Sequence, residues 1–213
     1  MKPRLLDLFC GAGGATKGYQ RSGFYVVGVD IKPQPHYCGD ELYQADALTF
    51  PLEGYDAYHA SPPCQEYTRA TNKQRKYEGY KYPELIEPIR KRLMETGKPY
   101  VIENVIGSPL YTTVILRGDM FGLKVIRPRL FELSFLILQP QIKKKKGMIC
   151  GEDYFRVMKG GLWLNSNEKR GSFEDWAKAM GMDWTNFEEL TQAIPPAYTE
   201  YIGKYLLQVV KNE

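Results

Sequence analysis

Short apolar runs alternate with helix-forming segments along the first two thirds of the chain, and this alternation restricts the possible folds more than any other feature. Helix-forming composition fills residues 15–22 and about 83–95, where apolar side chains recur on one face. The apolar runs cover residues 5–9, 24–30, 55–60 and 99–103. Strands that alternate with helices predict an α/β domain with a doubly wound, parallel sheet. Residues 130–138 would add a strand near its far edge.

Length and composition are those of a globular protein. The chain has 213 residues, of which 43% are hydrophobic and 25% are charged. These values suit one compact domain, or one domain with a small appendage, rather than a fibre or a disordered chain. The first residues do not resemble a signal peptide, and no run of about 18 apolar residues is present. We therefore expect a monomeric, cytoplasmic protein that does not interact with a membrane.

The cysteine and histidine content argues against a structural metal site. Four cysteines, at positions 10, 38, 64 and 150, have no CxxC spacing, and the chain has two histidines. We therefore predict no bound metal and reduced thiols. The net charge of +4 is a mild basic excess, which permits a polyanionic partner without requiring one.

A glycine-rich turn follows the first apolar run. Gly11 and Gly13 lie in this turn, where missing side chains would let the backbone approach a ligand, although an ordinary strand-to-helix turn explains them equally well. The second apolar run ends in Asp30, whose carboxylate could accept both hydroxyls of a ribose. Asp46 lies at a plausible third strand end, where it could bind an adenine amino group. Together these residues predict an adenosine-shaped pocket at the carboxyl edge of the sheet.

A thiol, a carboxyl group and two guanidinium groups follow later strands. Two prolines precede Cys64, which suits a nucleophile that must be held still, although free cysteines are more often buried and inert. Glu103 ends the next apolar run and could face the thiol, or it could be solvated. Arg127 and Arg129 open the following run, where a guanidinium would bind a phosphate or a carbonyl oxygen and lower the thiol pKa. An exposed basic strand end is the alternative.

Five motifs in this order resemble those of the DNA (cytosine-5) methyltransferases. They are "DLFCGAGG", "SPPCQ", "ENV", "RPRLFE" and "TQAIPPAYTEYIG". The resemblance implies a class I methyltransferase fold, Rossmann-like and doubly wound, that uses S-adenosyl-L-methionine. About 50 residues separate the arginine motif from the last motif, which resembles the short, bacteriophage-encoded enzymes with a reduced target-recognition region.

The resemblance assigns two groups of residues. It implies a cofactor site in which Phe9, Gly11 and Gly13 line the cofactor, Asp30 holds the ribose, Ile31 packs on the adenine and Asp46 binds its amino group. It implies a catalytic group in which Cys64 attacks C6 of cytosine, Glu103 steadies N3 and the exocyclic amine, Arg129 contacts O2, and Arg127 supports Glu103 or a phosphate.

The implied organisation has three parts: a catalytic domain over residues 1–139, a small inserted lobe over 140–185 with minimal target recognition, and a C-terminal motif and helix over 186–213. Two capping-box patterns predict short helices before the last one, at Ser172 with Asp175 and at Thr185 with Glu188. Two positions depart from the family's pattern. Val125 replaces a glutamine, and Thr191-Gln192 replaces a Gly-Asn pair.

Two basic stretches are candidates for contact with nucleic acid. Lysines and arginines alternate with tyrosines from Tyr67 to Tyr82, which would suit a loop that closes over DNA. Lys143 to Lys146 form a second basic run, and a solvated surface is the alternative for both. The expected substrate is DNA, in a role such as protecting host or phage DNA against restriction. RNA is the alternative substrate, and a catalytically silent binding module is the alternative function.

Overall fold

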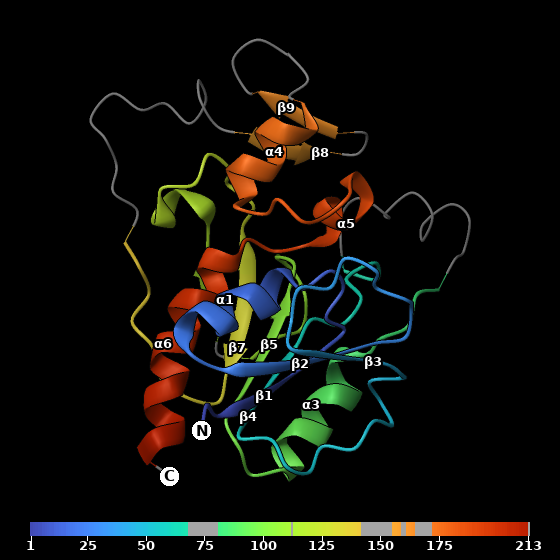
Figure 1. Ribbon diagram of the computed structural model, residues 1–213, viewed down its shortest axis with the longest axis vertical. Coiled ribbons are helices and arrows are strands. Elements are labelled where there is room, and N and C mark those ends of the chain that lie inside the picture. Colours follow the sequence, from blue (N-terminus) through green and yellow to red (C-terminus); the bar gives the residue numbers. More distant parts are fainter. Residues whose placement is uncertain (68–80, 112, 142–154, 159–160, 165–171, 213) are drawn as a thin grey trace.

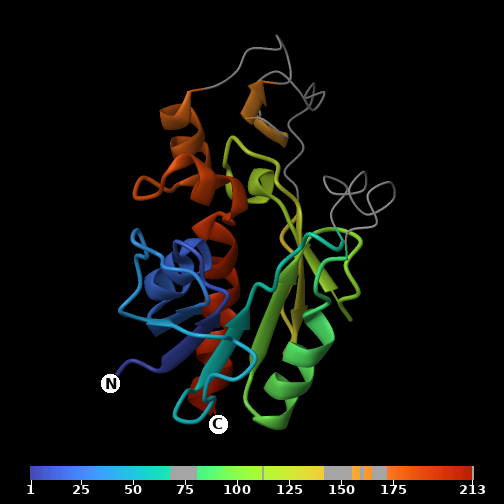
Figure 2. The ribbon, with the colours of Figure 1, turned by 90° about the vertical axis from the view of Figure 1, so that its right-hand side faces the viewer.

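The computed structural model describes residues 1–67, 81–111, 113–141, 155–158, 161–164 and 172–212. A seven-stranded sheet forms its centre, with helices on both faces (Figure 1). Figure 2 shows α1 (Gly14–Ser22) and α6 (Pro196–Asn212) on one side of the sheet and α3 (Ile86–Glu95) on the other. The structure therefore has the three layers of a doubly wound α/β domain.

The strand order is β3-β2-β1-β4-β5-β7-β6. The parallel strands are β1 (Arg4–Leu8), β2 (Tyr25–Asp30), β3 (Glu41–Gln44), β4 (Ala57–Ala60) and β5 (Tyr100–Asn104). Because β1 lies between β2 and β4, the chain changes direction across the sheet at this point. Ligands of open α/β sheets bind at the carboxyl ends of the strands beside such a reversal.

The sequence predicts a parallel, doubly wound sheet, and the sheet departs from parallel pairing at its far edge. Strand β7 (Arg129–Leu133) runs antiparallel to both β5 and β6 (Thr113–Leu116). The chain between β6 and β7 contains only the short 3-10 helix η2 (Gly118–Phe121), and a parallel connection needs a longer crossover. The strand predicted over residues 130–138 is also shorter than expected, since it ends at Leu133.

Alternating side chains of β1 fill both faces of the sheet. Leu5 packs in a cluster with Tyr19 and Ile202 beneath α1 and α6, whereas Leu6 packs with Ile89 of α3 on the opposite face. Such two-sided burial explains why the parallel strands are continuous apolar runs in the sequence.

Helices α1 and α6 pack at very short range because small residues face each other. A side chain at Gly18 would overlap the backbone of Pro196 and the Thr199 hydroxyl. Thr199 in turn donates its hydroxyl hydrogen to the Ala15 carbonyl at 2.8 Å. This contact brings the start of α6 against the glycine-rich turn.

Two short helices, α4 (Phe173–Met180) and α5 (Phe187–Gln192), pack around a separate apolar cluster that contains Val125 and Trp176. The predicted capping box of Ser172 and Asp175 is confirmed.

The prediction for the start of α5 is wrong by one residue. Asn186 and Glu189 form its capping box, because the Asn186 side chain accepts from the Glu189 backbone N–H at 2.9 Å. Thr185, the expected cap, is buried instead.

Residues 142–154, 159–160 and 165–171 of the predicted lobe over 140–185 lie outside the described residues. The described part of the lobe includes the antiparallel pair β8 (Phe155–Met158) and β9 (Gly161–Leu164) and the region from residue 172 onward. The three predicted domain boundaries therefore stay predictions. None of the described helices has the length and apolar character needed to span a bilayer.

Candidate active site

The glycine-rich turn joins β1 to α1 at the carboxyl edge of the sheet. Phe9, Gly11 and Gly13 all have positive φ angles, of 60°, 50° and 88°. A side chain added at Gly11 would meet no atom within 4 Å, so the space over this part of the turn is open. At Gly13 a side chain would lie 2.8 Å from the Cys38 sulfur, so only glycine fits there. The turn therefore leaves its backbone accessible for a ligand at Gly11.

Asp30 connects the ends of β1 and β2. Its Oδ2 accepts from the Gly11 backbone N–H at 3.0 Å, and its Oδ1 accepts from Lys32 N–H at 2.9 Å. Each carboxylate oxygen has a second lone pair, and Asp30 is only half-buried, so it can still accept hydrogen bonds from sugar hydroxyls.

The next residues around the turn are exposed. The Ile31 side chain is 64% exposed although it is large and apolar, and Asp46 is exposed beyond β3. The Asp46 Oδ1 accepts from Leu48 N–H at 2.9 Å, which fixes the carboxylate in a turn. An open glycine turn, a carboxylate for hydroxyls and an uncovered apolar side chain fit a nucleoside cofactor.

Two contacts from the C-terminal part of the chain hold this region, and sequence reasoning missed both. The Trp184 indole N–H donates to the Ala12 carbonyl at 2.9 Å, and His36 lies 3.0 Å from the Glu189 carboxylate. The first contact joins residues 172 positions apart, and no local pattern in the sequence signals it.

Cys64 lies in a loop after β4 that is tied to two neighbouring strands. Ser61 N–H donates to the Leu8 carbonyl at 3.1 Å, at the end of β1. The Asn104 side-chain amide donates to the Pro62 carbonyl at 2.9 Å, from the end of β5. Asn104 is part of the "ENV" motif, but the sequence did not reveal this role. The loop therefore has a fixed position between β1 and β5.

Glu103 and Arg129 form an ion pair beside this loop. The Arg129 Nε lies 3.0 Å from the Glu103 Oε1, and both side chains are largely buried. Burial raises the pKa of Glu103, while the charge of Arg129 and a hydrogen bond from the Ser61 hydroxyl partly offset this rise.

Arg127 is buried directly beside the pair. Its guanidinium donates to the Thr191 carbonyl at 2.6 Å, and its backbone has a φ of 30°. Burial, followed by the charge of Arg129, lowers the pKa of Arg127 to about 9. The Tyr198 hydroxyl donates to the Arg127 carbonyl at 2.8 Å and supports this unusual backbone. Val125 packs in the apolar cluster described above, so it supplies no side-chain hydrogen bond here.

The expectation that arginines lower the thiol pKa is only partly right. The charges of Arg129 and Arg127 do act in that direction on Cys64. Burial acts more strongly in the opposite direction, and the Glu103 charge adds to it, so the pKa of the thiol is raised overall. The thiol is therefore protonated at neutral pH in this state of the site.

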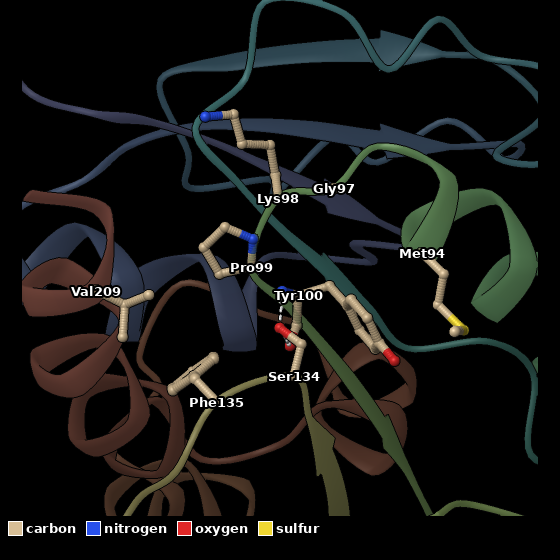
Figure 3. Close-up of a pocket in the computed structure, with 8 residues that line it drawn as sticks. All are labelled: Met94, Gly97, Lys98, Pro99, Tyr100, Ser134, Phe135 and Val209. Atoms are coloured by element: carbon tan, nitrogen blue, oxygen red, sulfur yellow. Dashed lines mark hydrogen bonds between the residues drawn. The ribbon is translucent and has the colours of Figure 1, made fainter. Parts of the chain in front are cut away.

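The sheet's opposite edge holds a hollow of about 350 Å³, shown in Figure 3. Its lining includes Met94 at the end of α3, Pro99 before β5 and Val209 of α6. It lies at the amino ends of the strands, away from every predicted site residue, so it is not the candidate active site.

The described structure brings all ten predicted site residues to one edge of the sheet, in two adjacent groups. The roles assigned to them stay predictions. The basic residues of 68–80 and Lys143 to Lys146 lie outside the described residues, so contact between these stretches and nucleic acid is also not tested.

No family model and no curated protein matches this chain. Solved structures do resemble it. One is described as a candidate DNA modification methyltransferase encoded within a prophage (E. coli), with a TM-score of 0.67 and 16% identity over 99% of this chain and 100% of the other. The Dnmt2 methyltransferase of S. pombe has a TM-score of 0.61 and 14% identity, with 98% and 99% covered. The Entamoeba histolytica methyltransferase EhMeth has a TM-score of 0.63 and 13% identity, with 99% of each chain covered. The chain therefore has the fold of the class I S-adenosylmethionine-dependent methyltransferases.

Proposed function

We propose that the protein is a methyltransferase that uses S-adenosyl-L-methionine to methylate C5 of cytosine in DNA, as a short, phage-type member of the cytosine-5 enzymes. The arrangement of Cys64 beside the Glu103–Arg129 pair, at the edge that also carries the glycine turn and Asp30, supports this most strongly. A nucleophile and a base-binding pair then lie next to a cofactor site.

The cofactor would bind to the glycine turn and the acidic strand ends. Bound there, S-adenosylmethionine supplies a methyl group on a positively charged sulfur. Gly11 leaves room over the turn, Asp30 would accept from the ribose hydroxyls, and the exposed Ile31 would cover one face of the adenine. Asp46 would accept from the adenine amino group.

Cys64 has to activate a carbon that is a poor nucleophile. Its sulfur bonds to C6 of cytosine as the thiol proton leaves to solvent. The electron pair of the C5–C6 double bond shifts so that C4 and C5 become doubly bonded, and N3 takes a proton from Glu103. Arg129 donates to O2 and neutralises the charge that collects on this side of the ring. A buried Glu103 whose pKa is raised is suited to carry that proton.

The remaining steps restore the ring. C5 takes the methyl group, and the N3 proton returns to Glu103 as the C4–N3 double bond re-forms. A base then removes the C5 proton, the C5–C6 double bond returns, and the Cys64 thiolate leaves. Because the target carbon lies inside a duplex, the base must be extruded from the helix before Cys64 reaches it.

The decisive experiment combines transfer and trapping. The purified protein is incubated with tritiated S-adenosylmethionine and duplex DNA, single-stranded DNA or tRNA, and the modified base is identified by mass spectrometry. 5-Methylcytosine in DNA supports the proposal, whereas label confined to tRNA moves the same chemistry to RNA. DNA that contains 5-fluorocytosine has no removable C5 proton and should trap a denaturation-resistant adduct with the wild type but not with Cys64→Ser. Absence of both label and adduct, with cofactor bound, contradicts the proposal.

A further inference from the structure

A chain of polar side chains leads from helix α1 toward Glu103. The Tyr19 hydroxyl lies 2.9 Å from His59 Nδ1, and His59 Nε2 lies 2.9 Å from the Ser61 hydroxyl oxygen. Ser61 follows β4 beside Glu103 of β5, since Ala60 is the register partner of Ile102, and its hydroxyl acts on the Glu103 carboxyl group as a donor that lowers its pKa. Tyr19 and His59 are fully buried, and Tyr19 belongs to a different layer of the fold from Glu103.

We propose that Tyr19, His59 and Ser61 form a relay of positioning residues that orients the Glu103 carboxyl group and sets its proton affinity. The proposal rests on the function proposed above, in which Glu103 contacts the cytosine ring. None of the three relay residues needs to touch the substrate or the cofactor.

The imidazole in the middle of the relay is neutral. Burial alone lowers the pKa of His59 to about 3. The carboxyl group on the neighbouring strand is that of Asp7, the register partner of His59 on β1. Burial raises the pKa of Asp7 to about 7, so this carboxyl group is largely protonated below that pH. A neutral ring has one N–H donor and one acceptor nitrogen. If one ring nitrogen accepts a hydrogen bond, the other must therefore donate one, which couples the two ends of the relay.

The hydrogen-bond direction is determined at both ends. An ionised Glu103 only accepts, so Ser61 must donate to it and must accept from the Nε2–H of His59. His59 Nδ1 is then the acceptor for the Tyr19 hydroxyl. In the reverse direction Tyr19 O–H would need another acceptor, and within the described part of the chain His59 is its sole hydrogen-bond partner. Tyr19 therefore favours the direction that stabilises the Glu103 carboxylate.

The relay acts on Glu103 together with the charges that face it. Arg129 of β7 pairs with it at 3.0 Å, and Arg127 acts on it from the turn before β7. Cys64 lies on the substrate side, and Asp7 of β1 is a more distant carboxyl group that senses the Glu103 charge. Because Ser61 is neutral, loss of the relay removes a donor from Glu103 without changing the net charge around it.

Tyr19→Phe tests the relay because it removes one hydroxyl and keeps the ring. We expect kcat to fall about 3- to 10-fold, the size of one lost hydrogen bond, with little change in the KM for the cofactor. Ser61→Ala removes the relay residue next to Glu103 and should have a larger effect than Tyr19→Phe. In both variants the pH profile limb that reports Glu103 ionisation should move to higher pH. Tyr58→Phe is the matched control, because its buried hydroxyl bonds the Leu52 carbonyl outside the relay and its loss should leave the profile unchanged.

A second measurement does not depend on activity. The chain has two histidines, so nitrogen NMR of the wild type and of His36→Gln identifies the His59 ring signals. We expect the Nε2–H tautomer, with no protonation between about pH 5 and 8, and a mixture of tautomers in Tyr19→Phe. An Nδ1–H tautomer in the wild type, or a Tyr19→Phe variant with the wild-type tautomer and pH profile, would overturn the relay. A wild type that methylates nothing would instead contradict the proposed function, and the tautomer would still decide about the relay.

Discussion

The two halves of the carboxyl edge differ in the type and the burial of their polar groups. On the cofactor side, after β1 to β3, backbone N–H groups and half-exposed carboxylates dominate, as in the contact between Gly11 and Asp30. On the base side, after β4, β5 and β7, buried charged side chains lie against one another, as in the Glu103–Arg129 pair. The cofactor side therefore presents hydrogen-bonding groups that a ligand can reach. The base side holds charged groups away from water, where each charge is stabilised by its neighbours. Substitutions on the base side should therefore affect catalysis, and those on the cofactor side should affect binding.

The largest expected effect separates the two halves most clearly. Cys64→Ala removes the proposed nucleophile, so methyl transfer should fall by about 10⁴-fold or more, because the sulfur that adds to C6 is lost. The dissociation constant of the cofactor should stay within about twofold of the wild type by calorimetry, because Cys64 is assigned to the base side and not to the cofactor site. If the Cys64→Ala protein still transferred methyl groups, Cys64 would not be the nucleophile.

Glu103→Gln keeps the shape of the base side but removes its negative charge and its ability to carry a proton. We expect kcat to fall by about 10²- to 10³-fold, within the range for a lost general acid. The variant also leaves Arg129 without its charged partner, so thermal unfolding has to be measured alongside. Glu53→Gln, an exposed carboxylate on the opposite edge, is the control and should change neither property.

Asp30→Ala acts on the cofactor half. It removes the acceptor for Gly11 N–H and for the ribose hydroxyls, so the dissociation constant for S-adenosylmethionine should rise by about 10- to 100-fold. At saturating cofactor the turnover rate should recover to within a few-fold of the wild type. A turnover rate that stayed low at saturation would show that Asp30 belongs functionally to the base side.

Asp7, beneath the glycine turn, is the exception on the cofactor half because it is a fully buried carboxyl group. Burial raises its pKa from 3.8 to about 7, and its Oδ1 has no hydrogen-bond partner among the described residues. The folded protein therefore binds one more proton than the unfolded chain between these two values. The resulting stabilisation is fully present below about pH 4 and is lost as the pH rises to about 7, by an amount on the order of 4 kcal/mol.

Asp7→Asn should remove this dependence, since the amide does not titrate and its oxygen can still accept from Thr16. Urea unfolding of the wild type and the variant at pH 4 to 8 measures this pH dependence. The difference between their free energies of unfolding should change across that range. Asp46→Asn, at an exposed site, provides the matched control. A constant difference for Asp7→Asn would mean that Asp7 is ionised in the folded protein at low pH.

The sequence predicted the parts of this edge that depend on local patterns. The apolar runs located β1, β2, β4 and β5. The position of Cys64 and Glu103 at strand ends, together with the family motifs, predicted that the two residues lie close together. It did not predict the antiparallel β7, the start of α5 at Asn186, or the raised pKa of the Cys64 thiol. Each of these depends on what is packed nearby in space: the short η2 connection, a competing cap one residue away, and burial that outweighs two arginines.

The smallest predicted effect concerns Trp184, where the C-terminal region touches the glycine turn. Trp184→Phe removes the hydrogen bond to the Ala12 carbonyl but keeps an aromatic ring near Lys17. Because Ala12 lies between Gly11 and Gly13, we expect a looser turn and a cofactor dissociation constant raised about 2- to 5-fold, with kcat unchanged. Calorimetry measures the constant, and Asp183→Asn provides an exposed neighbouring control. Unchanged affinity would mean that the cofactor half is complete in the first 50 residues, whereas a fall in kcat would mean that α5 also positions the base side through the Thr191 carbonyl on Arg127.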